Sequence, residues 1–392
     1  MPWRVSRLSR NRSTAASLLL LLLALSSTAC KSGDPVRLAE EASPLTKTQQ
    51  ELEARQGSQQ ADGRPVLQIC ESAPLPRRQI DDGDWNRTRS RIAATLMSPR
   101  HVVADILSTG KSDVTIAGKF GHGPVVKDLE REKVEIYYDD CSGSFQKVGI
   151  AETDGEGWLS FRWRREQLPD YGMYQLYFRV AADGSDAVST MRILPQGTKI
   201  AIFDIDGTLT TSDHELWKDW AADAGRFARV DDYVPKLRSG ASAVTRHRAW
   251  QQGYIPVYLT GRFYWMYYRT RSWMAATGVA PGHLEMAPGW SEWLPFNGGV
   301  GTFKAEYIES LRDQGFEISI MYGNATTDVW AYEFNFTGSE QIFLFDNTSD
   351  LDEAENIDSS YLNHLYQLER DEKEPITQPF VYPVLSGGHE PN

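Results

Sequence analysis

The sequence predicts a two-domain chain, in which an all-β sandwich precedes an α/β domain with a doubly wound parallel sheet. Short runs of alternating apolar and polar residues occupy residues 112–195, and continuous apolar runs alternate with helical stretches after residue 196. An alternating run indicates a half-buried strand, whereas a continuous apolar run indicates a strand covered on both faces. Alternation of such strands with helices is typical of a parallel sheet between two helical layers.

The first 29 residues have the pattern of an export signal. Four arginines precede an apolar run from Leu18 to Leu25, which is too short to span a membrane as a mature helix, and Ser27-Thr28-Ala29 forms a small-residue cleavage site. Cys30 follows directly and resembles the acylated cysteine of a bacterial lipoprotein, although Ser27 replaces the favoured leucine. The alternative is an ordinary signal peptide followed by a chance cysteine. We expect an exported chain that is lipid-anchored to a bacterial membrane. The expected membrane is the outer membrane, with the protein on the side that faces the periplasm.

Two further segments and the overall charge complete the organisation of the chain. Residues 30–79 are rich in Glu, Gln, Ser, Arg and Pro, which indicates a flexible tether, and residues 371–392 form a C-terminal tail. Cys70 and Cys141 are the remaining cysteines, and in an exported chain they predict one disulfide. The net charge of −12 excludes a general basic surface, so we expect no nucleic-acid partner.

Residues 80–195 predict a helical lead-in and an immunoglobulin-like β-sandwich. The lead-in, at 84–108, is interrupted at Ser98-Pro99. Six strands are expected after it, at 114–120, 134–138, 146–151, 158–163, 174–180 and 188–194. Strands of this length, separated by turns such as Asp183-Gly184, are typical of a sandwich. We assign this domain no chemistry.

Residues 196–370 predict the α/β domain. Its strands are expected at 200–203, 255–259, 318–322 and 342–345, and its helices at 239–252, 262–277 and 303–314. Gly253, Gly278 and Gly315 stand where helix C-caps belong.

Two carboxylates follow the first of these strands. Asp204 ends the strand and Asp206 lies two residues later. In an open parallel sheet the ligand lies beyond the carboxyl ends of the strands, so Asp204 is expected at the mouth of a site. Two close carboxylates repel, and Mg²⁺ would relieve that repulsion because it takes oxygen ligands from one or two carboxylates and a phosphate. Asp204 could then attack phosphorus as a nucleophile, while Asp206 protonates the leaving oxygen and later activates water.

The stretch Asp204-Ile205-Asp206-Gly207-Thr208-Leu209-Thr210 resembles the first motif of the haloacid dehalogenase superfamily. Extended to Asp213, it resembles the catalytic domain of lipins (the LNS2 domain), which are magnesium-dependent phosphatidate phosphatases. Related domains end the retinal-degeneration-B type phosphatidylinositol transfer proteins. The resemblance covers residues 195–370 and implies that Gly207 and Thr208 contact the substrate.

Three further motifs fit this resemblance. Thr260-Gly261-Arg262 resembles the phosphate-binding second motif, with the Thr260 hydroxyl and the first amides of the following helix expected to hold a phosphate. Lys304, expected to open a helix, resembles the lipin lysine and would neutralise charge on the transferred phosphoryl group.

The last motif runs from Met321 to Tyr332 and resembles the fourth motif of the superfamily. It places Asn324 and Asp328 beside the metal. The sequence does not decide which of the two binds Mg²⁺ directly and which binds it through water. Asp346 is a weaker candidate, expected to cap or support the site.

The spacing of the motifs leaves little room for a large cap over the site, which suits a bulky or membrane-embedded substrate. Aromatic residues crowd the stretch after Thr260, among them Phe263, Trp265 and Tyr268, and could lie at a lipid surface; the alternative is that most of them pack on the sheet. We therefore expect a Mg²⁺-dependent phosphatase, a phosphoric monoester hydrolase, acting on phosphatidate or a similar phospholipid. Two alternatives remain: a phosphatase for a soluble phosphomonoester, and a non-catalytic phospholipid sensor.

Overall fold

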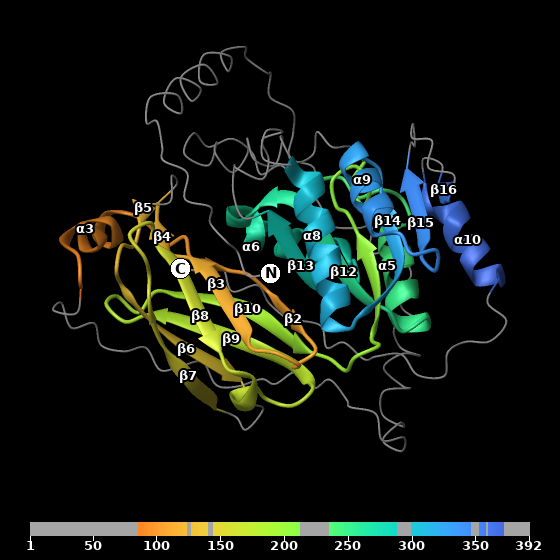
Figure 1. The fold of residues 1–392 in the computed structure, drawn as a ribbon. Coiled ribbons are helices and arrows are strands. Elements are labelled where there is room, and N and C mark those ends of the chain that lie inside the picture. The colour runs from red at the N-terminus through yellow and green to blue at the C-terminus, as the bar shows by residue number, and fades with distance from the viewer. Residues whose placement is uncertain are drawn as a thin grey trace, which may run out of the picture. The chain divides into compact units, whose positions relative to one another are not determined.

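The computed structural model describes residues 85–123, 127–139, 144–211, 235–287, 299–345, 353–357 and 360–371. They belong to one compact unit, in which a β-sandwich precedes an α/β domain (Figure 1). The export signal, Cys30, Cys70, Cys141 and Asp346 lie outside these residues, so the expectations about them stay predictions. Within the described part of the chain, none of the helices combines the length and the apolar character needed to cross a bilayer.

The sandwich is built from two sheets. One has the order β1-β3-β8 and the other the order β2-β10-β9-β6-β7. The strands are β1 (Val102–Val103), β2 (Ile106–Ser108), β3 (Val114–Lys119), β6 (Lys133–Asp139), β7 (Phe145–Glu152), β8 (Trp158–Trp163), β9 (Gly172–Val180) and β10 (Asp186–Ile193). Outside these sheets lie α3 (Thr88–Leu96), β4 (Gly121–His122), β5 (Lys127–Asp128) and a 3₁₀ turn, Arg165–Gln167.

The six strands predicted in this region are confirmed, and all except β7, which has no fully buried residue, bury at least one face. In β6, for example, Val134 and Ile136 are fully buried while Lys133 is exposed. The helical lead-in predicted at 84–108 is wrong in its second part, because helix α3 ends at Leu96 and the strands β1 and β2 follow it. Two or three residues are too few to show the period of a strand.

The α/β domain contains a six-stranded, wholly parallel sheet with the order β13-β12-β11-β14-β15-β16. Its strands are β11 (Lys199–Phe203), β12 (Ile255–Phe263), β13 (His283–Ala287), β14 (Glu317–Gly323), β15 (Gln341–Phe345) and β16 (Ala354–Ile357). Its helices are α5 (Ala241–Arg246), which continues as a π-helix over His247–Gln251, α6 (Tyr267–Thr277), α8 (Gly299–Gln314), α9 (Thr326–Asn335) and α10 (Tyr361–Asp371). A 3₁₀ turn, Tyr264–Met266, leads into α6.

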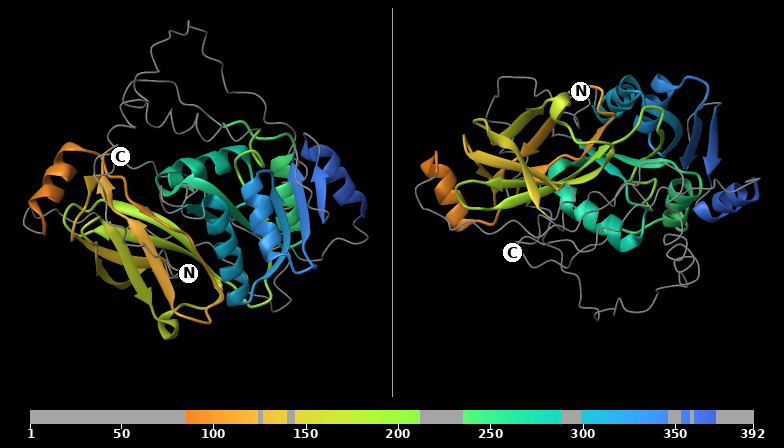
Figure 2. Two further views of the ribbon diagram at one scale, coloured as in Figure 1. Left: turned by 45° about the horizontal axis from the view of Figure 1, so that its top comes forward. Right: turned by 90° about the horizontal axis from the view of Figure 1, so that it is seen from below.

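Helices cover both faces of this sheet. The right-hand view of Figure 2 shows α8 and α9 over one face and α5, α6 and α10 over the other. The chain passes from β11 outwards to β12 and β13, and then returns to β14 on the other side of β11. The order therefore reverses between β11 and β14, and ligands of open α/β sheets bind at this switch point, beyond the carboxyl ends of the strands.

Two predicted helix starts are wrong. The helix predicted at 262–277 begins at Tyr267, because β12 continues to Phe263, which pairs with Ala287 of β13. The helix predicted at 303–314 begins at Gly299, so Lys304 lies in its second turn and does not open it.

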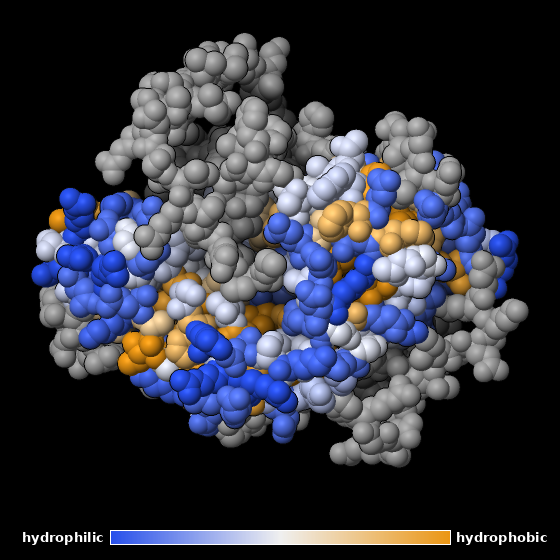
Figure 3. Space-filling view, in the orientation of Figure 1, coloured by the Kyte–Doolittle hydropathy of each residue, from blue (hydrophilic) through white to orange (hydrophobic). Residues whose placement is uncertain are grey.

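Of the two interpretations of the aromatic residues after Thr260, packing within the protein is the one that the structure supports. Phe263 is only 2 % exposed, and Trp265 and Tyr268 are half-buried, because these rings pack among themselves and against the neighbouring strands. The exposed aromatic side chains of α9 are Trp330 and Phe334, whose rings stack 5.6 Å apart. Figure 3 shows apolar residues among hydrophilic ones over α9.

Candidate active site at the switch point

Asp204 lies directly beyond β11, at the switch point. Its backbone N–H donates to the carbonyl of Tyr322 on β14 over 3.0 Å, which continues the pairing of the two strands for one residue. The apolar residues Ile200 to Phe203 bury β11 on both faces, so the strand delivers Asp204 into an interior position where it is 4 % exposed. The carboxylate expected at the mouth of the site is therefore buried.

The loop after Asp204 is a tight turn. The amides of Leu209 and Thr210 both donate to the carbonyl of Ile205, and Gly207 N–H donates to the Thr210 hydroxyl over 2.9 Å. Gly207 has φ +80°, a conformation that a β-carbon disfavours. Arg238 fixes the turn from outside by donating Nη2–H to the Gly207 carbonyl over 2.6 Å.

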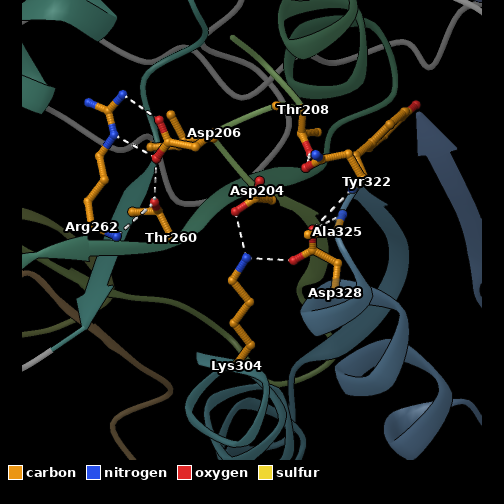
Figure 4. A network of polar contacts seen from close by, with 12 residues as sticks. Asp204, Asp206, Thr208, Thr260, Arg262, Lys304, Tyr322, Ala325 and Asp328 are labelled. Atoms are coloured by element: carbon orange, nitrogen blue, oxygen red, sulfur yellow. Dashed lines mark hydrogen bonds and ion pairs between the residues drawn. The ribbon is translucent and has the colours of Figure 1, made fainter. Parts of the chain in front are cut away.

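Lys304 connects two of the predicted acidic residues. From α8, its Nζ lies 2.6 Å from Asp204 Oδ1 and 2.5 Å from Asp328 Oδ1 (Figure 4). Burial alone lowers the pKa of Lys304, but the charges of Asp204 and Asp328 outweigh it and raise that pKa above its ordinary value. Lys304 is therefore a fixed cation between two buried carboxylates.

Asp328 also organises the start of α9. Its Oδ2 accepts hydrogen bonds from the backbone amides of Asn324, at 3.1 Å, and Ala325, at 3.0 Å. These amides are at the helix N-terminus, where the helix dipole also favours a negative charge. Asn324, in turn, accepts a hydrogen bond from the Thr208 hydroxyl at its Oδ1, 2.9 Å away. Asp328 and Asn324 thus join the fourth motif to Lys304 and to the first motif.

Arg262 holds the second carboxylate of the first motif. Its Nε and Nη2 donate to Asp206 Oδ2 and Oδ1 over 2.9 and 2.8 Å, which is a bidentate pair (Figure 4). Thr260 lies beside this pair, with its Oγ1 3.4 Å from Asp206 Oδ2. The Arg262 guanidinium is fully buried, hydrogen-bonded to Thr270 and lying 5.5 Å from the centre of the Trp273 ring.

The sequence therefore identified residues that come together, but not all of their surroundings. Thr260, Gly261 and Arg262 lie in β12 and not at a helix start, so the expected row of helix amides is not formed there. Thr260 Oγ1 instead accepts the backbone N–H of Arg262 over 3.2 Å. Sequence reasoning missed Arg238, because an arginine outside any motif gives no signal of contact with Gly207, and did not assign a role to the motif residue Thr210.

The donor chemistry of the site suits Mg²⁺. Burial and then the charge of Asp328 raise the pKa of Asp204 to about 8, although Lys304 lowers it. In the described part of the chain, the three carboxyl groups of Asp204, Asp206 and Asp328 are paired with only two cations, Lys304 and Arg262, so a bound cation would favour the ionised form of Asp204. Among the described residues, no three His, Cys, Asp or Glu side chains are arranged as a metal-binding group. Mg²⁺ does not require such a group, because it is usually held by one or two carboxylates together with waters and phosphate oxygens. The residues therefore fit Mg²⁺ held mainly by water and substrate.

Fold and site together define an α/β protein with an acidic, lysine-bridged centre at the switch point of a parallel sheet. Residues 201–346 match the family model described as the LNS2 domain of PITM 1-3, and residues 99–193 match the model of the PITM 1-3 beta-sandwich domain. The two matches follow the α/β domain and the sandwich of the structure.

Curated relatives agree with these two matches. The chain is 27 % identical over 314 residues to human membrane-associated phosphatidylinositol transfer protein 1, covering 78 % of this chain and 23 % of that protein. It is 26 % identical over 265 residues to Drosophila melanogaster protein retinal degeneration B, covering 66 % of this chain and 19 % of that protein. The chain spans about a quarter of the length of the curated relatives it matches.

Among solved structures, the sensor domain of the anti-sigma factor RsgI4 of Pseudobacteroides cellulosolvens aligns with 26 % of this chain and 98 % of its own. The identity is 13 % and the TM-score 0.20, which is too low to support an argument about fold or function.

Proposed function

We propose that this chain is a Mg²⁺-dependent phosphatase with a haloacid dehalogenase-like α/β domain, which hydrolyses phosphatidate or a similar phospholipid through an aspartyl-phosphate. One observation carries the proposal: Lys304 bridges Asp204 and Asp328 at the switch point, with Asp206 beside them. Transfer of a phosphoryl group requires a nucleophile, a cation and a proton donor within one site. Asp204, Lys304 and Asp206 would supply these three groups in that order.

The first step would form a bond between an Asp204 carboxylate oxygen and phosphorus, and break the bond from phosphorus to the ester oxygen. Lys304 would stabilise the charge on the transferred group, because its Nζ already lies 2.6 Å from Asp204 Oδ1. Asp206, protonated for this step, would give its proton to the departing alkoxide. Both Asp206 oxygens accept from Arg262 in the structure, so donation requires one of them to leave the guanidinium.

In the second step, water would attack the phosphorus of the aspartyl-phosphate, and Asp206 would accept a proton from that water. The products are inorganic phosphate and an alcohol, with Asp204 and Asp206 returned to their starting states. Asp204 and Asp206, with Asn324 or Asp328, would hold a bound Mg²⁺, which would supply positive charge for the phosphate oxygens.

The experiment is phosphate release from phosphatidate and lysophosphatidate in mixed micelles and from soluble esters, each with Mg²⁺ and with EDTA. We expect release that depends on Mg²⁺ and is lost in Asp204→Asn. Asp313→Asn, at an exposed position of α8, is the matched control and should keep full activity. Equal efficiency on glycerol phosphate and phosphatidate would favour the phosphatase for soluble esters.

A second candidate is a phospholipid-binding domain without turnover. The bidentate pair of Arg262 with Asp206 favours it, because it occupies both oxygens of the residue that must donate a proton. The relatives are, moreover, named phosphatidylinositol transfer proteins. Saturable binding of phosphatidate vesicles with no Mg²⁺-dependent phosphate release from any ester would support this candidate.

We also propose that the mature chain is exported and held at a bacterial membrane by an acyl chain on Cys30. The support is the sequence alone: a basic and then apolar N-terminus that ends in small residues directly before that cysteine. Such an anchor would keep the phosphatase beside a phospholipid substrate.

A further inference from the structure

Asp105, in the β-sandwich, is a buried carboxylate with an unusual number of partners. It lies between β1 and β2, and its side chain is 0 % exposed. Within the sandwich it accepts the backbone N–H of Thr190 at Oδ1 over 3.2 Å, and Arg192 Nη1 lies 3.9 Å from Oδ2. These two partners come from β10.

The other partners of Asp105 come from the α/β domain. The Tyr267 hydroxyl donates to Oδ1, the Arg271 guanidinium pairs with Oδ2, and the backbone N–H of Leu284 on β13 donates to Oδ2 over 3.2 Å. Tyr267 and Arg271 are four residues apart on α6, so Asp105 binds two successive turns on one side of that helix.

The same helix holds Arg262. Thr270 Oγ1 lies 3.3 Å from Arg262 Nη1, and the Trp273 ring lies beneath the guanidinium. Arg262 in turn makes the bidentate pair with Asp206. Because α6 is one continuous helix of 11 residues, contacts that hold it at Tyr267 and Arg271 also position Thr270 and Trp273. A continuous set of contacts therefore runs from the sandwich to the second carboxylate of the site.

We propose that Asp105 is a positioning residue, which acts through α6 and Arg262 to place the Asp206 carboxylate beside the leaving oxygen. The β-sandwich thereby gains a role in the reaction, since it supplies the anion that sets the helix. This inference rests on the proposed phosphatase function and concerns one step of it, proton donation to the leaving group.

The reaction offers a readout that a purely structural role would not move. An alkoxide needs a proton in order to leave, whereas a nitrophenolate leaves without one. We therefore expect Asp105→Asn to lower kcat/KM, which covers only the steps up to departure of the leaving group, at least tenfold on an alkyl phosphate and less than threefold on p-nitrophenyl phosphate. Because kcat also includes hydrolysis of the aspartyl-phosphate, where Asp206 acts as the base for both esters, kcat is not the readout. Tyr267→Phe, which removes one hydrogen bond and leaves the ring in place, should show the same selectivity with a smaller loss.

Asp113→Asn is the matched control. Asp113 is a sandwich carboxylate that pairs with Arg162 and accepts the backbone N–H of Arg165, without a hydrogen bond or ion pair to α6 among the contacts of the described residues. It should leave both rates unchanged. Equal losses on the two esters in Asp105→Asn, or no loss on either, would overturn the inference; if Asp105→Asn does not fold, the selectivity of Tyr267→Phe decides.

Amide hydrogen exchange supplies a second readout, independent of turnover. We expect faster exchange across residues 260–277 in Asp105→Asn and Tyr267→Phe than in wild type, and no change in Asp113→Asn. If the wild type turns over neither ester, the proposed function fails and the role of Asp105 in the reaction fails with it; exchange then tests only the contacts from Asp105 to Arg262. If the wild type turns over both esters, unchanged exchange at these residues in Asp105→Asn rejects the inference.

Discussion

Replacing Lys304 by methionine would keep most of the side chain's length and remove its charge from between two buried carboxylates. The Nζ atom contacts Asp204 and Asp328 at 2.6 and 2.5 Å, and the three side chains are 3 %, 5 % and 0 % exposed. Removing one partner of a buried ion pair leaves a buried charge without compensation, which costs roughly 3–5 kcal/mol of unfolding free energy.

Protonation sets the upper limit of this cost. The pKa of Asp204 is already raised to about 8 in the wild type, so the additional proton in the variant is taken up by the other carboxyl group of the pair. For an ordinary pKa near 3.9 that protonation costs about 5 kcal/mol at pH 7.5. The folded-state pKa of this group would then lie above its unfolded value, so the protonated group favours the fold at low pH and this contribution is lost as pH rises. The deficit of the variant should therefore shrink by up to about 1.4 kcal/mol per pH unit between pH 7.5 and 5.5.

Urea unfolding in EDTA, followed by tryptophan fluorescence, would measure both effects. Lys199→Met is the control, because Lys199 forms an exposed pair with Glu317 and should cost no more than about 1 kcal/mol. The double variant Lys304→Met/Asp328→Asn should recover part of the loss, since it removes one of the repelling carboxylates. A Lys304→Met deficit below about 1 kcal/mol that does not change with pH would refute the assigned role of Lys304.

Four other outcomes follow from the same structure. Asp204→Asn should abolish phosphate release while leaving the unfolding midpoint within a few degrees of wild type; substantial residual turnover would exclude the aspartyl-phosphate. Gly323→Ala should lose about 1–3 kcal/mol in urea unfolding, because the added β-carbon would lie 2.6 Å from the β-carbon of Asp328, and a neutral result would show that α9 can move aside. Burial and then the charge of His122 lower the pKa of His101 to about 3. The contribution of the neutral ring to the unfolding free energy is therefore fully present above pH 6.5 and is lost as the pH falls from 6.5 towards 3. Between pH 7 and 5 wild type should lose about 2 kcal/mol more unfolding free energy than His101→Asn, and parallel pH curves would contradict that assignment. Labelled palmitate should enter the wild-type protein but not Cys30→Ser, and equal labelling of the two would reject the anchor.

Local pattern was enough to predict much of the fold. The strands that hold the site, β11, β12 and β14, were predicted to within a residue or two at their starts, because an apolar run bounded by polar residues is a local signal. Gly278 was predicted as a helix C-cap and has φ +68° beyond the last turn of α6. The order of the motifs along the chain likewise placed Asp204, Arg262 and Asp328 near one another before any contact was known.

Contacts between distant segments decided the rest. Arg262 and Phe263 lie in a strand because β13, which was not predicted, pairs with the end of β12 and supplies partners that a helix start would not have had. The aromatic residues after Thr260 are buried by elements far away in the sequence, so composition alone could not separate a packed face from a lipid-facing one.

The sequence by itself therefore determined which chemical groups this protein carries and on which elements they stand, because helix and strand periods are set by neighbouring residues. Only the tertiary structure decided their partners. Lys304 bridges Asp204, 100 residues away, and Asp105 contacts α6 across 162 residues, and such pairings depend on the order in which the strands join the sheet. The physical reason is that burial makes an unpaired charge costly, so each buried group takes whichever partner the topology brings within reach.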